Sequence, residues 1–337
     1  YFHHQTFFHK RGLDHIEMTN HYITWWNVEN LFDERDAPAE RRPEDLKRKI
    51  HADLKNWTSE VLERKLNQLA SVINQVNEGR GPDVLGLCEV ENAHVLHRLI
   101  EKVGVDRNYK LIHHDMSDNR GIDVAFIYDG GKYEFVPDSF FHYPVIKRYP
   151  TREIVQAGLK TAKGNELVLL GNHWPSRSAG QLESEPYRIL TAETLSYFME
   201  RIQEIKGKDV PVVVMGDFND EPHNRSLTDY ALSTMDREKV VYARNPALYN
   251  LMWELLGRRK GSYVYSGVPM MIDQFLVSKG VAKKSGKFEL NEQKVKIEIF
   301  AGMVSGRYDT PVRFGQSDPN LDGYSDHLPI SFVLGEK

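Results

Sequence analysis

Strand-like and helix-like segments alternate along this chain, and that alternation restricts its fold more than any other feature of the sequence. Tyr22–Trp26 is β-branched and aromatic, and residues 83–89 form a short apolar run. Between them, residues 58–77 carry apolar side chains spaced alternately four and three positions apart, which predicts a helix with one buried face. Gly79, Gly81 and Pro82 end this helix, and Asn92 can cap a second one. The order strand, helix, strand, helix indicates an α/β protein.

Two segments of the chain resemble each other. Val84–Cys88 is apolar and is followed by Glu89, while Val212–Met215 is apolar and is followed by Asp217. An amphipathic helix precedes each, so we expect two similar halves, each a sheet covered by helices on one side. Packed sheet to sheet, they predict a four-layer α/β/β/α sandwich with two mixed sheets. No linker separates the halves, and we therefore predict one domain over residues 22–337.

The first 21 residues have no periodic pattern, and we interpret them as an N-terminal extension, either disordered or an expression remnant. They include four histidines, which leave a metal-binding tract as the alternative: His3, His4, His9 and His15.

Composition excludes several classes of protein. The chain has 337 residues, a net charge of −4 and a single cysteine, so no internal disulfide can form. No apolar run approaches the roughly 18 residues that span a bilayer, and we expect a soluble protein, cytoplasmic or secreted after loss of a leader. The acidic balance means that any contact with nucleic acid must be local. The basic run Arg258–Lys260 is expected to be a solvated face, with a nucleic-acid backbone contact as the alternative.

Polar side chains collect where the apolar strands end. Asn27, Glu89, His173 and Asp217 each follow such a strand, and others begin one. Scaffolds commonly display functional groups at these positions. Most of them are short acids and amides without cysteine, and such hard oxygen donors suit Mg²⁺, Mn²⁺ or Ca²⁺ better than structural zinc.

Seven segments in order carry a family resemblance: Trp26–Phe32, Leu87–Asn92, Asp123–Phe126, Gly171–Trp174, Gly216–Asp220, Ile272–Phe275 and Ser325–Ile330. Together they resemble the endonuclease/exonuclease/phosphatase superfamily, which includes DNase I, abasic-site endonucleases, sphingomyelinases and inositol-polyphosphate 5-phosphatases. The resemblance covers about residues 22–333. It implies the DNase I-like sandwich and hydrolysis of a phosphate ester by in-line attack of water with a divalent ion.

The resemblance also implies roles for individual residues. Asn27, Glu89 and Asp326 match metal-site positions, with Mg²⁺ the expected ion and Mn²⁺ or Ca²⁺ as alternatives. A metal ion there would neutralise charge on the phosphoryl oxygens.

The catalytic positions follow in the same way. Asp217 and Asn219 match the pair beside the attacking water, and His327 the group that contacts the scissile phosphate, with Asp273 fixing its tautomer. His173 would donate to a phosphoryl oxygen, with Asp123 as the expected partner that orients it.

Two arginines complete the predicted site. Arg120 and Arg177 flank it and are candidates to bind a substrate phosphate, with solvated loop charges as the alternative.

The resemblance leaves the substrate open. We expect a nuclease acting on DNA or RNA, because the pair His173 and His327 resembles the DNase branch. The abasic-site subgroup is less expected, since it has a tyrosine where His173 stands. The alternatives are a phosphatase or sphingomyelinase-like enzyme acting on a lipid or small phosphorylated substrate, and a non-catalytic binding protein. We predict a monomer with nucleic acid as its substrate and no protein partner.

Overall fold

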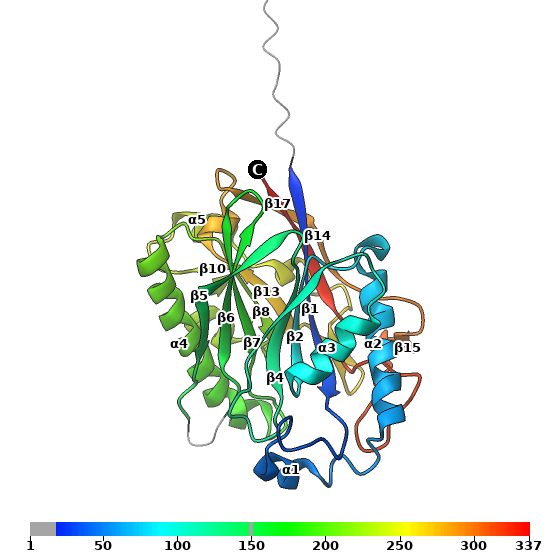
Figure 1. The fold of residues 1–337 in the computed structure, drawn as a ribbon. Coiled ribbons are helices and arrows are strands. Elements are labelled where there is room, and N and C mark those ends of the chain that lie inside the picture. Colours follow the sequence, from blue (N-terminus) through cyan, green and yellow to red (C-terminus); the bar gives the residue numbers. More distant parts are fainter. Residues whose placement is uncertain (1–17, 148–150) are drawn as a thin grey trace, which may run out of the picture.

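Two large mixed β-sheets pack face to face at the centre of the computed structural model, which describes residues 18–147 and 151–337 (Figure 1). The first sheet has the order β14 (Phe288–Ile297), β17 (Ile330–Glu336), β1 (Thr19–Leu31), β2 (Val84–Val90), β4 (Asp123–Asp129) and β3 (Tyr109–His113). The second has the order β5 (Tyr133–Tyr143), β6 (Ile154–Thr161), β7 (Glu166–His173), β8 (Val212–Asp217), β13 (Asp273–Val277), β10 (Leu248–Asn250) and β9 (Ser233–Thr234). Two hairpin-like pairs lie outside the sheets: β11 (Tyr263–Tyr265) with β12 (Val268–Met270), and β15 (Val304–Ser305) with β16 (Thr310–Pro311).

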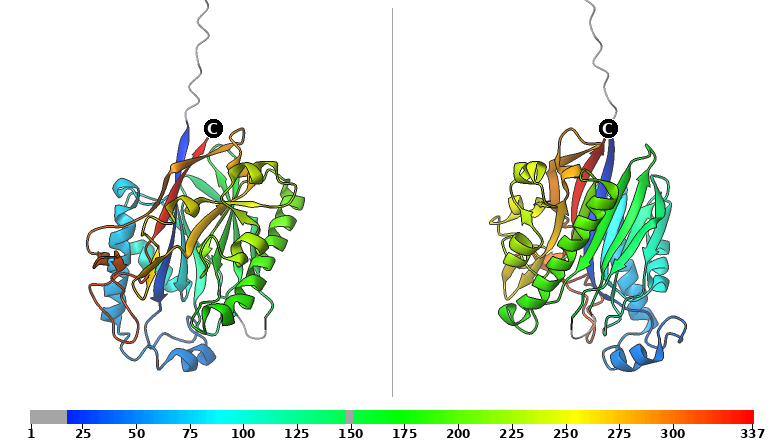
Figure 2. Two further views of the ribbon diagram at one scale, coloured as in Figure 1. Left: turned by 180° about the vertical axis from the view of Figure 1, so that it is seen from behind. Right: turned by 90° about the vertical axis from the view of Figure 1, so that its left-hand side faces the viewer.

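Helices cover the outer faces of both sheets (Figure 2). On the first sheet lie α2 (Ser59–Gly79) and α3 (Ala93–Lys102), and on the second lies α4 (Gln181–Lys206). Shorter helices are α1 (Glu44–Ile50), α5 (Arg237–Tyr242), α6 (Lys279–Ala282), the π-helical turn Ser226–Tyr230 and the 3₁₀ turn Leu251–Leu255. The predicted four-layer α/β/β/α sandwich is confirmed. Among the described residues, no helix has the length and apolar character needed to cross a membrane.

Three buried clusters correspond to the three interfaces between layers. One lies between the sheets, one between the first sheet and α2 and α3, and one between the second sheet and α4. Successive residues of a strand face opposite ways, so Trp25 enters the cluster between the sheets and Trp26 the cluster under the helices. Both are buried.

Several predicted boundaries differ from the structure. β1 begins at Thr19 rather than at Tyr22, because Thr19 pairs with Glu336 of β17 and His21 Nε2 lies 3.1 Å from a carboxylate oxygen of the same Glu336. Helix α1 and strand β14 were not predicted. Asn92 caps α3 as expected, accepting a hydrogen bond from the amide of Val95. The histidines of the predicted extension lie outside the described residues.

Each sheet contains a parallel pair of strands near its centre, and these pairs position the site. β1 runs parallel to β2, and β7 runs parallel to β8. In a parallel pair both carboxyl ends lie at the same sheet edge, so the polar residues that end these four strands are brought to one end of the sandwich.

Candidate active site

Side chains from the ends of β1, β2, β7 and β8 meet across the interface between the two sheets. Asn27 Nδ2 donates to Asp217 Oδ2 over 3.1 Å. His173 Nε2 lies 3.6 Å from Glu89 Oε1 and 3.7 Å from Asp217 Oδ2. The structure thus brings together four predicted residues that lie up to 190 positions apart in the sequence.

The backbone at these strand ends departs from regular β geometry. Glu29, Asn30, Glu89 and Asn219 have positive φ angles between 50° and 63°. The register between β1 and β2 also shifts after Asn27. Bulges of this kind redirect side chains and are frequent beside active sites. Here the irregular backbone lets the amide of Asn30 donate to Glu89 Oε2 over 3.0 Å.

A second group adds Asp273 and His327 to the same cluster. His327 Nδ1 lies 2.7 Å from Asp273 Oδ2, and its Nε2 lies 3.9 Å from Asp217 Oδ2. Asp273 Oδ1 accepts from the indole of Trp25 over 3.1 Å, which fixes the carboxylate. Asn219 donates its backbone amide to Asp217 Oδ1 over 2.9 Å. The carboxylate of Asp273 therefore holds one nitrogen of His327 and leaves the other facing Asp217.

Burial and charge give these groups different protonation states. Burial raises the pKa of Asp217 to about 7. For His327, burial acts to lower the pKa, but the carboxylates of Asp273 and Asp217 outweigh it and hold the pKa well above its ordinary value. The pKa of His173 lies well below its ordinary value, first because of burial and then because of Arg152 and Arg120. At neutral pH His327 is charged and His173 neutral, the pattern of tuned acid and base groups.

An acidic group lies next to this cluster. Desolvation raises the pKa of Asp326 to about 6, and the nearby charges of Glu29 and Glu89 add to that rise. Arg313 approaches Asp326 to 4.0 Å but bonds mainly to the buried Glu29, over 2.6 Å and 2.8 Å. Glu89 and Asp326 thus offer carboxylate oxygens whose mutual repulsion a cation would relieve. The donors are hard oxygens, and they fit a divalent ion such as Mg²⁺.

Both polar atoms of the Asn27 side-chain amide already make a hydrogen bond. Besides its donation to Asp217, its Oδ1 accepts from the backbone amide of Glu29 over 3.0 Å. A carbonyl oxygen has two lone pairs, so one remains available for an ion.

The two predicted phosphate-binding arginines differ. Arg120 is half exposed, donates to Asn30 Oδ1 over 2.6 Å and lies 3.6 Å from Glu89 Oε2, so it borders the site. Arg177 donates to the carbonyl of Asn219 over 2.6 Å, and to Asp220 and Asn224 as well. Its contacts hold the loop that carries Asn219, a role that the prediction of substrate binding did not include.

Asp123 does not lie where we expected it. Its Oδ2 is 2.9 Å from His113 Nε2, and its Oδ1 accepts from the amide of Met116. The Nδ1 atom of His173 is buried and has no hydrogen-bond partner among the described residues. The expected orienting contact from Asp123 to His173 is therefore wrong, because the neighbouring strand β3 presents His113 to that carboxylate first.

Three groups at the site escaped the sequence analysis. The buried carboxylate of Glu29 forms an ion pair with the exposed Arg313, which comes from a distant part of the chain. Lys65 of α2 is buried, donates to the carbonyl of Tyr324 over 2.7 Å, and burial lowers its pKa to about 8. The ring of Tyr263 lies 4.7 Å from that of His327. Of these groups, only Lys65 left a local signal in the sequence, because it is a lysine on the apolar face of a predicted helix.

Comparison with known proteins identifies the family. Residues 22–336 match the Endonuclease/Exonuclease/phosphatase family. No curated protein sequence matches the chain significantly.

Similar solved structures include a family protein from Bacteroides thetaiotaomicron at 15% identity, covering 95% of this chain and 99% of that one with a TM-score of 0.56. A mannosyl-6-phosphatase from the same species has 16% identity, coverage of 93% and 99%, and a TM-score of 0.54. D. rerio TDP2 complexed with a single-strand DNA product has 15% identity, coverage of 94% and 99%, and a TM-score of 0.57. At these identities the likeness establishes a shared fold. The match of the sequence over nearly its whole length establishes more: the chain belongs to the endonuclease/exonuclease/phosphatase family of phosphoester hydrolases.

Proposed function

We propose that the protein is a divalent-metal-dependent phosphodiesterase that cleaves nucleic acid by in-line attack of water. One observation carries the proposal: the buried carboxylate of Asp217 faces Asn27, His173 and His327 at 3.1 to 3.9 Å. Burial raises its pKa to about 7. A general base works best with a pKa near the operating pH, so Asp217 is suited to take a proton from water under neutral conditions.

The neighbouring groups would divide the remaining tasks. Asn219 lies beside Asp217 and would orient the attacking water. The charged ring of His327 would donate from Nε2 to a phosphoryl oxygen or to the leaving oxygen, with Asp273 as a positioning residue. Neutral His173 would supply a further donor. Loss of one donor of this kind typically lowers the rate about 10²- to 10³-fold.

Glu89 and Asp326, with the free lone pair of Asn27, would hold the divalent ion. When bound, Mg²⁺ would neutralise negative charge on the phosphoryl oxygens and the leaving group. Arg120 is placed to contact the same phosphate from the half-exposed rim of the site.

A basic cavity beside the site supports a polymeric substrate over a small phosphate ester. A cavity of about 430 Å³ is lined by Arg259, Lys260 and Arg307 against one acid, Glu221. It adjoins β12, and the partner strand β11 carries Tyr263 against His327. A nucleic acid offers further phosphates next to the scissile one, and these cations could bind one of them. The likeness in fold to a TDP2 that carries a single-strand DNA product is compatible with this substrate.

The test compares four substrates under Mg²⁺ and under EDTA: supercoiled plasmid, a single-strand oligonucleotide, bis(p-nitrophenyl) phosphate and p-nitrophenyl phosphate. The proposal expects cleavage of plasmid or oligonucleotide that requires Mg²⁺ and is lost in Asp217→Asn. Asp229→Asn, an exposed carboxylate, is the matched control and should cleave as the wild type does.

Activity on the monoester alone would replace the proposal with a phosphatase, the function named for the mannosyl-6-phosphatase neighbour. Sphingomyelin serves as a fifth substrate, for the lipid alternative.

A further inference from the structure

We propose that His114, His142 and Glu153 form a second metal site, separate from the catalytic cluster, that binds a transition metal of the Zn²⁺ class. The three side chains come from different elements. His114 follows β3, His142 lies in β5, and Glu153 immediately precedes β6. One ligand atom of each lies within 4.8 Å of the others.

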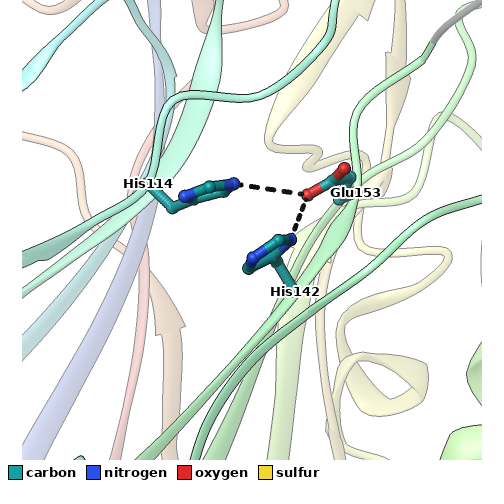
Figure 3. Close-up of side chains that lie close together, drawn as sticks. All are labelled: His114, His142 and Glu153. Atoms are coloured by element: carbon teal, nitrogen blue, oxygen red, sulfur yellow. Dashed lines mark ion pairs between the residues drawn. The ribbon is translucent and has the colours of Figure 1, made fainter.

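Both imidazoles direct a nitrogen at the same oxygen of Glu153 (Figure 3). His142 Nδ1 is 2.9 Å from Glu153 Oε2, and His114 Nε2 is 3.9 Å from it. Two ligands of a Zn²⁺ ion, each at about 2.0–2.1 Å, lie about 2.9 Å apart at a right angle and about 3.4 Å apart in a tetrahedron. The two separations to Glu153 Oε2 bracket these values, and the two histidine nitrogens lie within 4.8 Å of each other, so an ion could enter after small movements of the side chains.

The contacts within the cluster do not satisfy its polar atoms. Glu153 Oε2 is buried and has no hydrogen-bond partner among the described residues, although His142 Nδ1 is only 2.9 Å away. The two atoms are close enough for a hydrogen bond, but their geometry does not make one. A buried oxygen without a partner is uncommon in native proteins and calls for an explanation, and a bound cation supplies one.

The packing of the two rings also favours neutral ligands over an ordinary ion pair. Their centroids are 3.8 Å apart with an interplanar angle of 19°. Two charged imidazolium rings would repel each other in this arrangement, and a single carboxylate could not neutralise both. Two neutral imidazoles with one carboxylate instead form a ligand set typical of Zn²⁺, and leave positions open for water. His114 and His142 are partly exposed, which gives an ion access from solvent.

The position of the cluster indicates what a bound ion would do. β3 is the edge strand of the first sheet and β5 the edge strand of the second. The ion would join these two edges, which no backbone hydrogen bond links among the described residues. His114 also begins the loop over residues 114–122, which carries Arg120 to the rim of the active site. The site would therefore anchor one end of that loop against the second sheet.

The test titrates Co²⁺, a coloured substitute for Zn²⁺, into the full chain in millimolar Mg²⁺, which competes for the oxygen donors of the catalytic site. Visible absorption reports coordination, and Zn²⁺ retained after dialysis is counted by mass spectrometry. The variants are His114→Ala and Glu153→Gln, with His97→Ala, an exposed histidine elsewhere, as the control. The N-terminal histidines are present in every variant and cancel in the comparison.

We expect the wild type and His97→Ala to bind one ion more per chain than His114→Ala. Glu153→Gln keeps the shape of the side chain and should lower the affinity for the ion by roughly a hundredfold. Mutating a residue that only orients a metal ligand already lowers metal affinity about 10- to 100-fold, and Glu153 would be a ligand itself. If His114→Ala does not fold, as judged by circular dichroism, Glu153→Gln decides the question. The proposal would be overturned if the folded variants bound as many metal ions per chain as the wild type, with a Co²⁺ affinity within about threefold of it. Substrate is absent throughout, so this failure would be distinct from failure of the proposed activity.

Discussion

Replacing Asp273 with asparagine tests whether this buried carboxylate keeps His327 charged. In the wild type Asp273 accepts two hydrogen bonds, from His327 Nδ1 over 2.7 Å and from Trp25 Nε1 over 3.1 Å. An asparagine offers one acceptor and one donor in the same space. With the acceptor facing Trp25, its amide donor meets His327 Nδ1, which can accept that bond only as a neutral ring. The substitution therefore favours the uncharged imidazole.

The size of the change in the pKa of His327 follows from the hydrogen bond that the substitution removes. A hydrogen bond to a charged group contributes about 1.5–3 kcal/mol. One pKa unit corresponds to 1.36 kcal/mol, so the pKa of His327 should fall by about 1–2 units. Because the folded-state pKa of His327 is raised, its charged form persists at neutral pH and is lost as pH rises through that value. In Asp273→Asn this loss should begin at lower pH, and at pH above the wild-type pKa of His327 the rate should be about 10- to 100-fold below that of the wild type, as a pKa lowered by about 1–2 units requires.

Two assays measure this. The rate on bis(p-nitrophenyl) phosphate, followed from pH 5 to pH 10 at saturating Mg²⁺, should show its alkaline limb shifted to lower pH. Nitrogen-15 NMR of the His327 ring, assigned with His327→Gln, reports the pKa without catalysis. Asp229→Asn controls for loss of one acidic charge. Superimposable pH profiles and ring titrations in Asp273→Asn and wild type would refute the argument, because the carboxylate would then not hold the charge.

Three further substitutions test separate parts of the site. Asp217→Asn should abolish turnover. Its pKa in the fold, about 7, lies above the unfolded value, so the ionised carboxylate destabilises the protein increasingly as pH rises from about 4 to 7. In EDTA the variant should therefore melt at a higher temperature than wild type at pH 8 and show little gain at pH 4, and an equal gain at both would contradict this. Glu89→Gln should raise the Mg²⁺ concentration for half-maximal rate roughly 10- to 100-fold, and an unchanged metal titration would count against its role as a ligand. Arg177→Ala should lower the free energy of unfolding by about 1–3 kcal/mol and reduce kcat more than it changes KM, whereas a change confined to KM would restore the prediction of substrate binding.

The fold was largely predictable because its signals are local. The helical repeat of α2, the cap at Asn92 and the apolar strands before Glu89 and Asp217 each lie within a few residues. Strand β14 was missed because it lacks a clear pattern. Only Phe288 and Leu290 of its ten residues are buried, and lysines and glutamates interrupt the rest.

The residues of the site were predictable as a set, but their contacts were less so. Asp123 was assigned to His173 from the family resemblance, yet the choice between His113 and His173 as its partner depends on how β3 lies on β4. The pair of Glu29 and Arg313 spans 284 positions and leaves no periodic trace in the sequence. Partners of this kind are decided by the order of strands within a sheet and by how distant loops fold back on it, which local sequence patterns do not contain.

The site depends on both halves of the chain at once. Asn27 and Glu89 belong to the first sheet, whereas His173, Asp217 and Asp273 belong to the second. Their contacts cross the apolar interface between the sheets, and Trp25 from that interface fixes Asp273 directly. A rigid, closely packed interface tolerates little displacement, so the positions of the catalytic groups are set by the core beneath them. Two parallel strand pairs, one in each sheet, are what allow this: each pair delivers two carboxyl-terminal side chains to the same end, and packing the sheets brings the four together.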